Sequence, residues 1–120
     1  MYMSELLLDA QTGLDLVDND MELYKILLNG FLTDNSFDIE YLQDLYNKNK
    51  LDECASYVHR VKGSARQIAA KFLAQKGQEL EDLFREKNGP LTQFPQQQAK
   101  DFADAYEKTK PAVIEFYNMN

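Results

Sequence analysis

The only histidine of the chain stands in a stretch whose residue types suit chemistry on phosphate. His59 is followed by Lys62 three positions later and by Gly63 four positions later. On an α-helix these positions share one face. An imidazole is a nucleophile near neutral pH, an ammonium neutralises a phosphoryl group, and a glycine leaves room for that group to approach. The spacing therefore predicts a histidine that accepts a phosphoryl group and passes it on.

A single histidine on a helix is more often a structural or ordinary surface residue than a functional one, so its neighbours decide. A glycine inside a helix costs about 1 kcal/mol relative to alanine, which indicates a packing or access reason for Gly63. Ala55 lies four residues before the histidine and Gly63 four residues after it. Because small groups flank the ring on both sides, we expect the His59 side chain to be exposed.

Charge is distributed unevenly along the chain. The net charge of −7 and the pI of about 4.6 disfavour nucleic-acid binding through a broad basic surface. The segment from Cys54 to Gln78 nevertheless contains no Asp or Glu. Its basic residues are Arg60, Lys62, Arg66, Lys71 and Lys76. A solvated helix face would also give this pattern. The position of His59 within the basic segment nevertheless favours a docking site for an acidic partner surface. The expected contact residues are Arg60, Ser64 and Arg66.

Length and composition indicate one soluble domain over residues 1–120. Hydrophobic residues make up 44% of the chain, which argues against disorder. Cys54 has no intramolecular disulfide partner, and one His with one Cys makes a structural zinc site improbable. The apolar run Leu6–Leu8 ends at Asp9 and is too short for a signal peptide or a membrane span. We expect a cytoplasmic protein that makes no membrane contact.

Apolar residues recur at helical spacing along most of the chain, and no alternating strand pattern of useful length occurs. The stripes run from Leu23 to Phe31, Phe37 to Tyr46, Leu51 to Ile68, Phe72 to Phe84 and Ala99 to Phe116. His59 lies one residue off the third stripe. The pattern predicts an all-α protein, an antiparallel up-down four-helix bundle with an additional N-terminal helix.

Capping and turn residues predict where these helices begin and end. Gly77 lies within an apolar stripe and is predicted to let a neighbouring helix approach closely. The boundary signals are a cap at Asn19 or Asp20, a break at Asn35–Ser36, an N-cap at Asp52, a loop at Asn88–Pro90, a helix start near Pro95 and a kink at Pro111.

The segment His59-Arg60-Val61-Lys62-Gly63-Ser64-Ala65 resembles the H-x-[LIV]-K-G-S-[AS] motif of histidine-containing phosphotransfer (HPt) domains. Residues 19–32 resemble the first conserved helix of that family, and Leu51–Glu53 resembles the entry to its histidine helix. Gln78-Glu79-Leu80-Glu81 resembles the segment that faces the histidine. The resemblance covers about residues 12–117. Where the family often has a second glycine ten residues after the histidine, this chain has Ala69, which affects only the local helix bend.

The resemblance implies a role in two-component phosphorelays. It implies His59 as the phosphoacceptor, Lys62 as the phosphate partner and Gly63 as the clearance residue. Glu81, or in second place Gln78, would bond the imidazole Nδ1 and leave Nε2 as the nucleophile. The implied partners are response-regulator receiver domains, which would supply the aspartyl phosphate and its Mg²⁺, and a hybrid sensor histidine kinase. A monomer is expected.

Missing motifs shape the predicted chemistry. No glycine-rich phosphate loop occurs, and no cluster of acids stands beside the histidine to hold magnesium. We therefore expect a phosphocarrier without a cofactor rather than a true enzyme. The rival interpretation is a helical adaptor that binds a signalling partner and is never phosphorylated, which the complete motif disfavours. A histidine-kinase dimerisation domain is disfavoured because the chain has no ATP-binding region.

Overall fold

The computed structural model describes residues 7–34 and 36–120, and the regular elements within these ranges are helices. None of these described helices combines the length and apolarity needed to cross a lipid bilayer. The predicted all-α class is therefore confirmed. In chain order the helices are α2 (Ala10–Leu16), α3 (Met21–Asp34), α4 (Ile39–Asn47), α5 (Leu51–Gln67), α6 (Lys71–Phe84) and α7 (Gln96–Met119).

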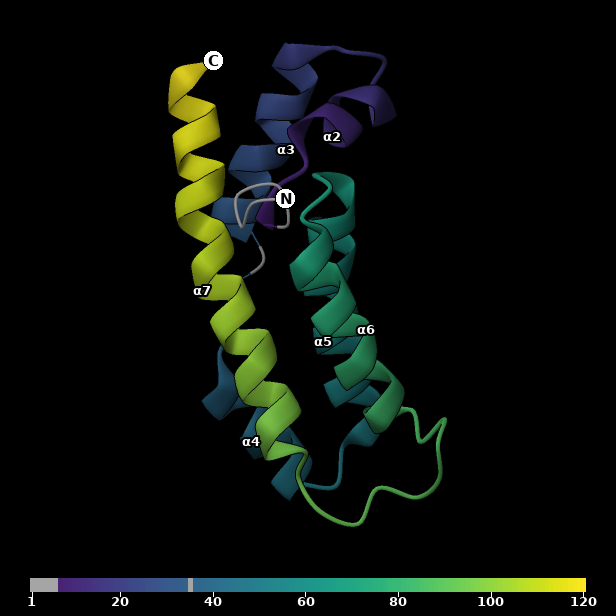
Figure 1. Cartoon of the computed structure of the whole chain (residues 1–120). Coiled ribbons are helices and arrows are strands. Elements are labelled where there is room, and N and C mark those ends of the chain that lie inside the picture. Colours follow the sequence, from purple (N-terminus) through teal and green to yellow (C-terminus); the bar gives the residue numbers. More distant parts are fainter. Residues whose placement is uncertain (1–6, 35) are drawn as a thin grey trace.

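The helices form an elongated bundle of 45 × 28 × 22 Å in which neighbouring long helices run in opposite directions (Figure 1). Helix α7 extends along the full length of the molecule, with α6 packed beside it. Helices α3 and α4 together occupy the fourth position, α3 near the C-terminal half of α7 and α4 near its N-terminal half. Helix α2 is the additional N-terminal helix and lies against α3.

Acidic side chains cap the two helices that share the fourth position. Asp20 Oδ1 accepts a hydrogen bond from the Leu23 N–H at 3.0 Å, so the predicted cap at Asn19 or Asp20 is Asp20. Asp38 Oδ1 accepts from the Glu40 N–H at 2.9 Å and caps α4. The predicted break falls between these helices, but Asn35 itself lies outside the described residues.

The buried side chains follow the predicted stripes with local differences. Tyr24, Leu28 and Phe31 of α3 are fully buried, but Leu23 is 41% exposed, because it falls on the edge of the arc that they define. On α7 the buried residues include Ala105 and Thr109, and the Thr109 hydroxyl donates to the Ala105 carbonyl. Helix α7 continues through Pro111; the kink there stays a prediction.

The predicted N-cap of α5 is wrong. The helix begins at Leu51, so Asp52 lies inside the first turn, and Lys50 occupies the cap position without a side-chain bond. The helix begins early because Asn49 adopts a left-handed backbone (φ 62°) that turns the chain directly from α4 into α5. Asp52 still contributes, since a carboxylate in the first turn interacts favourably with the helix dipole.

Ala69, which stands where the family often has a glycine, lies at the C-terminal end of α5 and not at a bend within the helix. Ala69 has φ 61°, in the left-handed region that favours glycine. The Ala70 N–H donates to the Ala65 carbonyl and the Ala69 N–H to the Arg66 carbonyl, the bonding pattern of a left-handed helix terminus. The turn is held from outside by the Asp9 N–H, which donates to the Ala69 carbonyl.

Gly77 brings three helices together, as the sequence predicts. A Cβ atom at this position would lie 3.0 Å from Lys62 Cβ on α5 and 3.0 Å from Phe102 Cε1 on α7. Both distances are shorter than ordinary van der Waals contact. The close approach of α5 to α6 therefore depends on the missing side chain at Gly77, and this approach sets the distance between residues that face each other across the two helices.

We predict opposite effects of alanine at the two helical glycines. Gly77→Ala should lower the free energy of unfolding by about 1 kcal/mol, because overpacking costs more than the gain in helix propensity. The matched change Gly63→Ala should raise it by about 1 kcal/mol, since a Cβ there meets nothing within 4 Å. Urea denaturation followed by circular dichroism measures both. Stabilisation by Gly77→Ala would contradict the close-packing interpretation.

Candidate functional site

His59 lies near the middle of α5 on the face turned away from the core. The buried face of this helix includes Val58, Val61 and Ala65, and the histidine follows Val58 directly. Its side chain is 56% exposed. One turn further along, the space around Gly63 is open, since nothing lies within 4 Å of a Cβ built there. The ring is therefore accessible from solvent, and the helix surface beside it is clear.

Glu81 on α6 holds the imidazole by one nitrogen. Both of its carboxylate oxygens lie 3.2 Å from Nδ1 of His59. An ionised carboxylate only accepts hydrogen bonds, so this contact puts the ring proton on Nδ1 and leaves the lone pair on Nε2. The carboxylate is 6% exposed, whereas the ring is mostly exposed. The buried group thus selects the tautomer of the neutral ring and leaves its other nitrogen accessible.

Lys62 is not on the solvent face where the spacing placed it. Its side chain is 5% exposed, and its Nζ lies 2.7 Å from Glu81 Oε1 and donates to Gln78 Oε1 at 2.9 Å. The stem passes Gly77, where no side chain obstructs it. Burial of an ammonium is tolerated here because a carboxylate and an amide oxygen meet it. The two bonds use two of its three donors.

Arg85 completes the group around Glu81 and is not part of the motif that pointed to the site. Its Nε donates to Glu81 Oε2 at 2.7 Å from the next turn of α6. Burial alone raises the pKa of Glu81, but hydrogen bonds from Lys62, Arg85 and His59 outweigh burial and lower the pKa to about 2. The glutamate is therefore ionised at neutral pH. The signal was present in the sequence, since residues four apart face each other on a helix.

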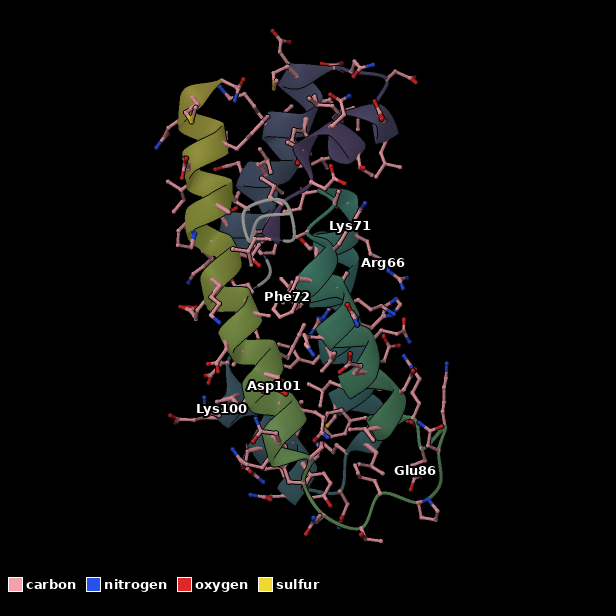
Figure 2. The ribbon with its side chains drawn as sticks, in the orientation of Figure 1. Arg66, Lys71, Phe72, Glu86, Lys100 and Asp101 are labelled. Atoms are coloured by element: carbon pink, nitrogen blue, oxygen red, sulfur yellow. The ribbon has the colours of Figure 1, made fainter. Side chains whose placement is uncertain are left out.

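Gln78, the second candidate for orienting the histidine, has other partners. Its Oε1 accepts from Lys62 and, at 3.1 Å, from Arg66 Nη2, while its Nε2 donates to Asp82 Oδ1 at 2.8 Å. The structure brings His59 within hydrogen-bonding distance of Glu81. Figure 2 shows Arg66 on the α5–α6 side of the bundle.

The three residues expected to contact a partner differ in exposure. Arg60 and Arg66 are exposed, and the Arg60 guanidinium lies 5.9 Å from the ring centroid of Tyr57. Ser64 is 8% exposed, because it lies towards the interior side of α5. The two arginines thus present positive charge on the exposed surface of α5, whereas the serine offers little surface.

The arrangement suits transfer of a phosphoryl group to and from a ring nitrogen. It offers an accessible Nε2, a buried carboxylate behind Nδ1, a buried ammonium with a spare donor and an open approach at Gly63. Among residues 7–34 and 36–120, no group of three His, Cys, Asp or Glu side chains gathers closely enough to hold a metal ion.

Comparison with protein families gives a match that contains the whole site. A family model described as Hpt domain matches residues 26–109. This range runs from within α3 to within α7 and lies inside the region of resemblance expected from the motifs. Comparison with curated proteins and with solved structures finds no match.

The low pKa of Glu81 predicts an acid-sensitive bundle. An unfolded glutamate titrates near 4.5 and the folded Glu81 at about 2, so its contribution to stability is complete above about pH 5 and is lost as the pH falls towards 2. A shift of this size corresponds to about 3 kcal/mol. Glu81→Gln should therefore show a smaller loss of unfolding free energy between about pH 6 and pH 3.

Denaturant titrations at several pH values measure this difference. Glu79→Gln is the matched control, because Glu79 is on the same helix but is 47% exposed. Its one ion pair, with Lys76, is long, at 3.6 Å. The control should keep the wild-type slope. Equal slopes for wild type and Glu81→Gln would contradict the ion-pair origin of the low pKa. Hydrogen bonds from Lys71 and Thr12 lower the pKa of Asp9 to about 2. Asp9 therefore adds a loss of stability in acid that is the same in the wild type and in both variants.

Proposed function

The chain belongs to the Hpt family of phosphotransfer domains, which act in two-component relays, and we propose that His59 is its phosphoacceptor. In this proposal His59 takes a phosphoryl group from an aspartate of a receiver domain and passes it to another receiver. The observation that carries the proposal is the pairing of an exposed imidazole with a buried carboxylate at Nδ1. In the neutral ring that pairing places the proton on Nδ1 and leaves the lone pair of Nε2 accessible.

The transfer itself is an in-line displacement at phosphorus. Nε2 of His59 forms the new bond to phosphorus as the bond to the aspartate oxygen breaks, and the electron pair of that bond leaves with the aspartate. The return step is the reverse. Such reactions depend on positioning and on neutralising charge on the phosphoryl oxygens. The third N–H of Lys62, beyond its bonds to Glu81 and Gln78, is available for one of these oxygens.

Partner recognition is proposed to use charge around the histidine. The chain has a net charge of −7, but Arg60 and Arg66 are exposed on α5 near His59. Receiver domains bring acidic residues and Mg²⁺ to the phosphorylation site, so a positive surface favours their encounter and orientation. Kinases of the same relays are further partners of the family. Ser64 contributes to this contact through its small size rather than through exposed surface.

His59→Gln should abolish phosphate acceptance and leave the bundle folded. The side chain is 56% exposed, and Glu81 keeps its bonds to Lys62 and Arg85. Exposed substitutions usually change stability by less than about 0.5 kcal/mol. The measurement is incubation with a phosphorylated receiver domain, followed by detection of label on this chain. Labelling of the variant at the wild-type rate would refute the proposal and leave the helical adaptor as the better interpretation.

The stability of the label identifies the bond. A phosphoramidate on histidine is lost in acid and retained in alkali, so the wild-type label should behave in this way. An acid-stable, alkali-labile label would indicate Ser64 or another hydroxyl as the acceptor. Treatment of the labelled chain with acid and with base, with recovery of the label, separates the two.

Gly63→Gln should separate access from helix stability. Glutamine is the better helix former, and the space at Gly63 is open, so the melting temperature should rise by a few degrees. The new side chain tilts towards the helix N-terminus, and therefore towards His59. It should slow transfer from a phosphorylated receiver by about tenfold or more, since displaced reactants lose rate steeply.

Gly63→Ala is the graded control for this change and should transfer at an intermediate rate. Both rates come from a time course with the same receiver, and both melting temperatures from circular dichroism. Normal transfer by Gly63→Gln would show that clearance at this position is not needed. Unfolding of the variant would show that Gly63 packs against a neighbour.

A further inference from the structure

We propose that the carboxylate of Glu81 sets the lifetime of the phosphorylated histidine by keeping a proton on Nδ1 after Nε2 has been phosphorylated. Arg85 opposes this effect by binding the same carboxylate. The inference rests on the proposed function, because it concerns the phosphorylated state of His59. It assigns to Glu81 a role after phosphorylation, beyond the choice of tautomer before it, and it assigns a positioning role to Arg85.

The chemistry of the leaving group is the reason. When the Nε2–P bond breaks, its electron pair returns to Nε2. If Nδ1 already carries a proton, the ring leaves as neutral imidazole, and the phosphoryl group passes to a water oxygen or to an aspartate oxygen without any further proton. If Nδ1 is unprotonated, the ring would leave as an anion unless a proton arrives from outside. The protonated form therefore reacts faster with both acceptors.

The geometry favours the protonated form. Both oxygens of Glu81 lie 3.2 Å from Nδ1, and an ionised carboxylate accepts a hydrogen bond but cannot donate one. A positive phosphorylated ring facing this carboxylate makes a charge-assisted hydrogen bond, which is about twice as strong as a neutral one. The carboxylate is 6% exposed, so solvent weakens the bond little.

Two cations share the same carboxylate with the histidine. Lys62 Nζ lies 2.7 Å from Oε1, and Arg85 Nε lies 2.7 Å from Oε2, both closer than the histidine nitrogen at 3.2 Å. Each cation draws electron density from the oxygen that it binds. Arg85 is half-exposed, at the end of α6, whereas Lys62 is buried. Arg85 is therefore the partner that can be removed with the least damage to the fold.

The charged groups around Glu81 come from two helices. His59 and Lys62 meet it from α5, and Arg85 meets it from its own helix. Arg66 and Asp82 are one step further away and reach this group through Gln78. Helix α7 meets α6 at Gly77 with the uncharged ring of Phe102. Among these, the carboxylate of Glu81 is the group in direct contact with Nδ1.

Two variants should change the lifetime in opposite directions. The full chain is phosphorylated with phosphoramidate, the reagent is removed, and the loss of phosphohistidine is followed by phosphorus NMR. Glu81→Gln should lengthen the half-life near neutral pH by about tenfold, because a neutral acceptor replaces a charged one. Arg85→Gln should shorten it by about two- to fivefold, because the full charge of Glu81 then faces the ring. A general loosening of the site would move both half-lives in the same direction.

The pH profile gives a second readout that a structural role does not affect. For the wild type the rate of loss should stay nearly constant between about pH 6 and pH 9, because Glu81 keeps Nδ1 protonated. For Glu81→Gln the rate should fall as the pH rises through this range. Glu79→Gln, an exposed change on the same helix, should keep the wild-type half-life and profile.

The outcomes separate this inference from the proposed function. If neither phosphoramidate nor a phosphorylated receiver labels the wild type, the proposed function fails and this inference fails with it. If the wild type is labelled on His59 but Glu81→Gln has the same half-life and pH profile, this inference alone is overturned. If Glu81→Gln takes up too little label, Arg85→Gln decides: an unchanged or longer half-life overturns the inference.

Discussion

The contact between Lys62 and Glu81 across the α5–α6 interface is the interaction on which the rest of the site depends. Their charged atoms are 2.7 Å apart, and both side chains are almost fully buried. Breaking a buried pair by removing one partner is costly, because the other charge is left without compensation. The pair therefore fixes the register of α5 against α6. Glu81 then stands directly behind His59, with its orientation set by a group that solvent does not reach.

The backbone makes this pair possible. Gly77 lies one turn before Glu81 on α6, and the absence of a side chain there lets the stem of Lys62 pass between the helices. A long stem can lie along apolar surface while its charged end reaches a polar partner. The end of α5 is held independently, since the Tyr24 hydroxyl donates to the Ile68 carbonyl at 2.8 Å and the Asp9 N–H donates to the Ala69 carbonyl at 3.0 Å. These bonds satisfy carbonyls that a helix terminus leaves free.

The result is a bundle with a polar group confined to the α5–α6 interface and the surface beside it. The interior is built from apolar and aromatic side chains, such as Phe31 and Phe102, which are fully buried. The polar side chains of His59, Lys62, Glu81 and Arg85 lie along the α5–α6 pair, with Lys62 and Glu81 buried and His59 exposed. The exposed members, His59 and Arg85, lie outside the hydrophobic core and are free to be specialised for chemistry.

The sequence alone determined the helical class, the family and the residues of the motif. Helical spacing of apolar residues predicts the fold class because burial requires one continuous face on each helix. The segment His59–Ala65 indicates the family because all the residue types of the motif, in their order, lie within seven consecutive positions. The sequence also indicated the close approach at Gly77. It placed the N-cap of α5 two residues late, at Asp52 instead of Lys50, since Asp52 has the residue type of a cap but Asn49 turns the chain earlier.

Only the tertiary structure decided which groups meet across helices. The sequence left Glu81 and Gln78 as alternatives, because residues three apart on a helix share one face, and the distance between helices is not encoded locally. It also put Lys62 on the surface beside His59, whereas the packing at Gly77 draws that side chain inward. The role of Arg85 also depends on helix packing, because its contact with Glu81 affects His59 only when α6 lies against α5.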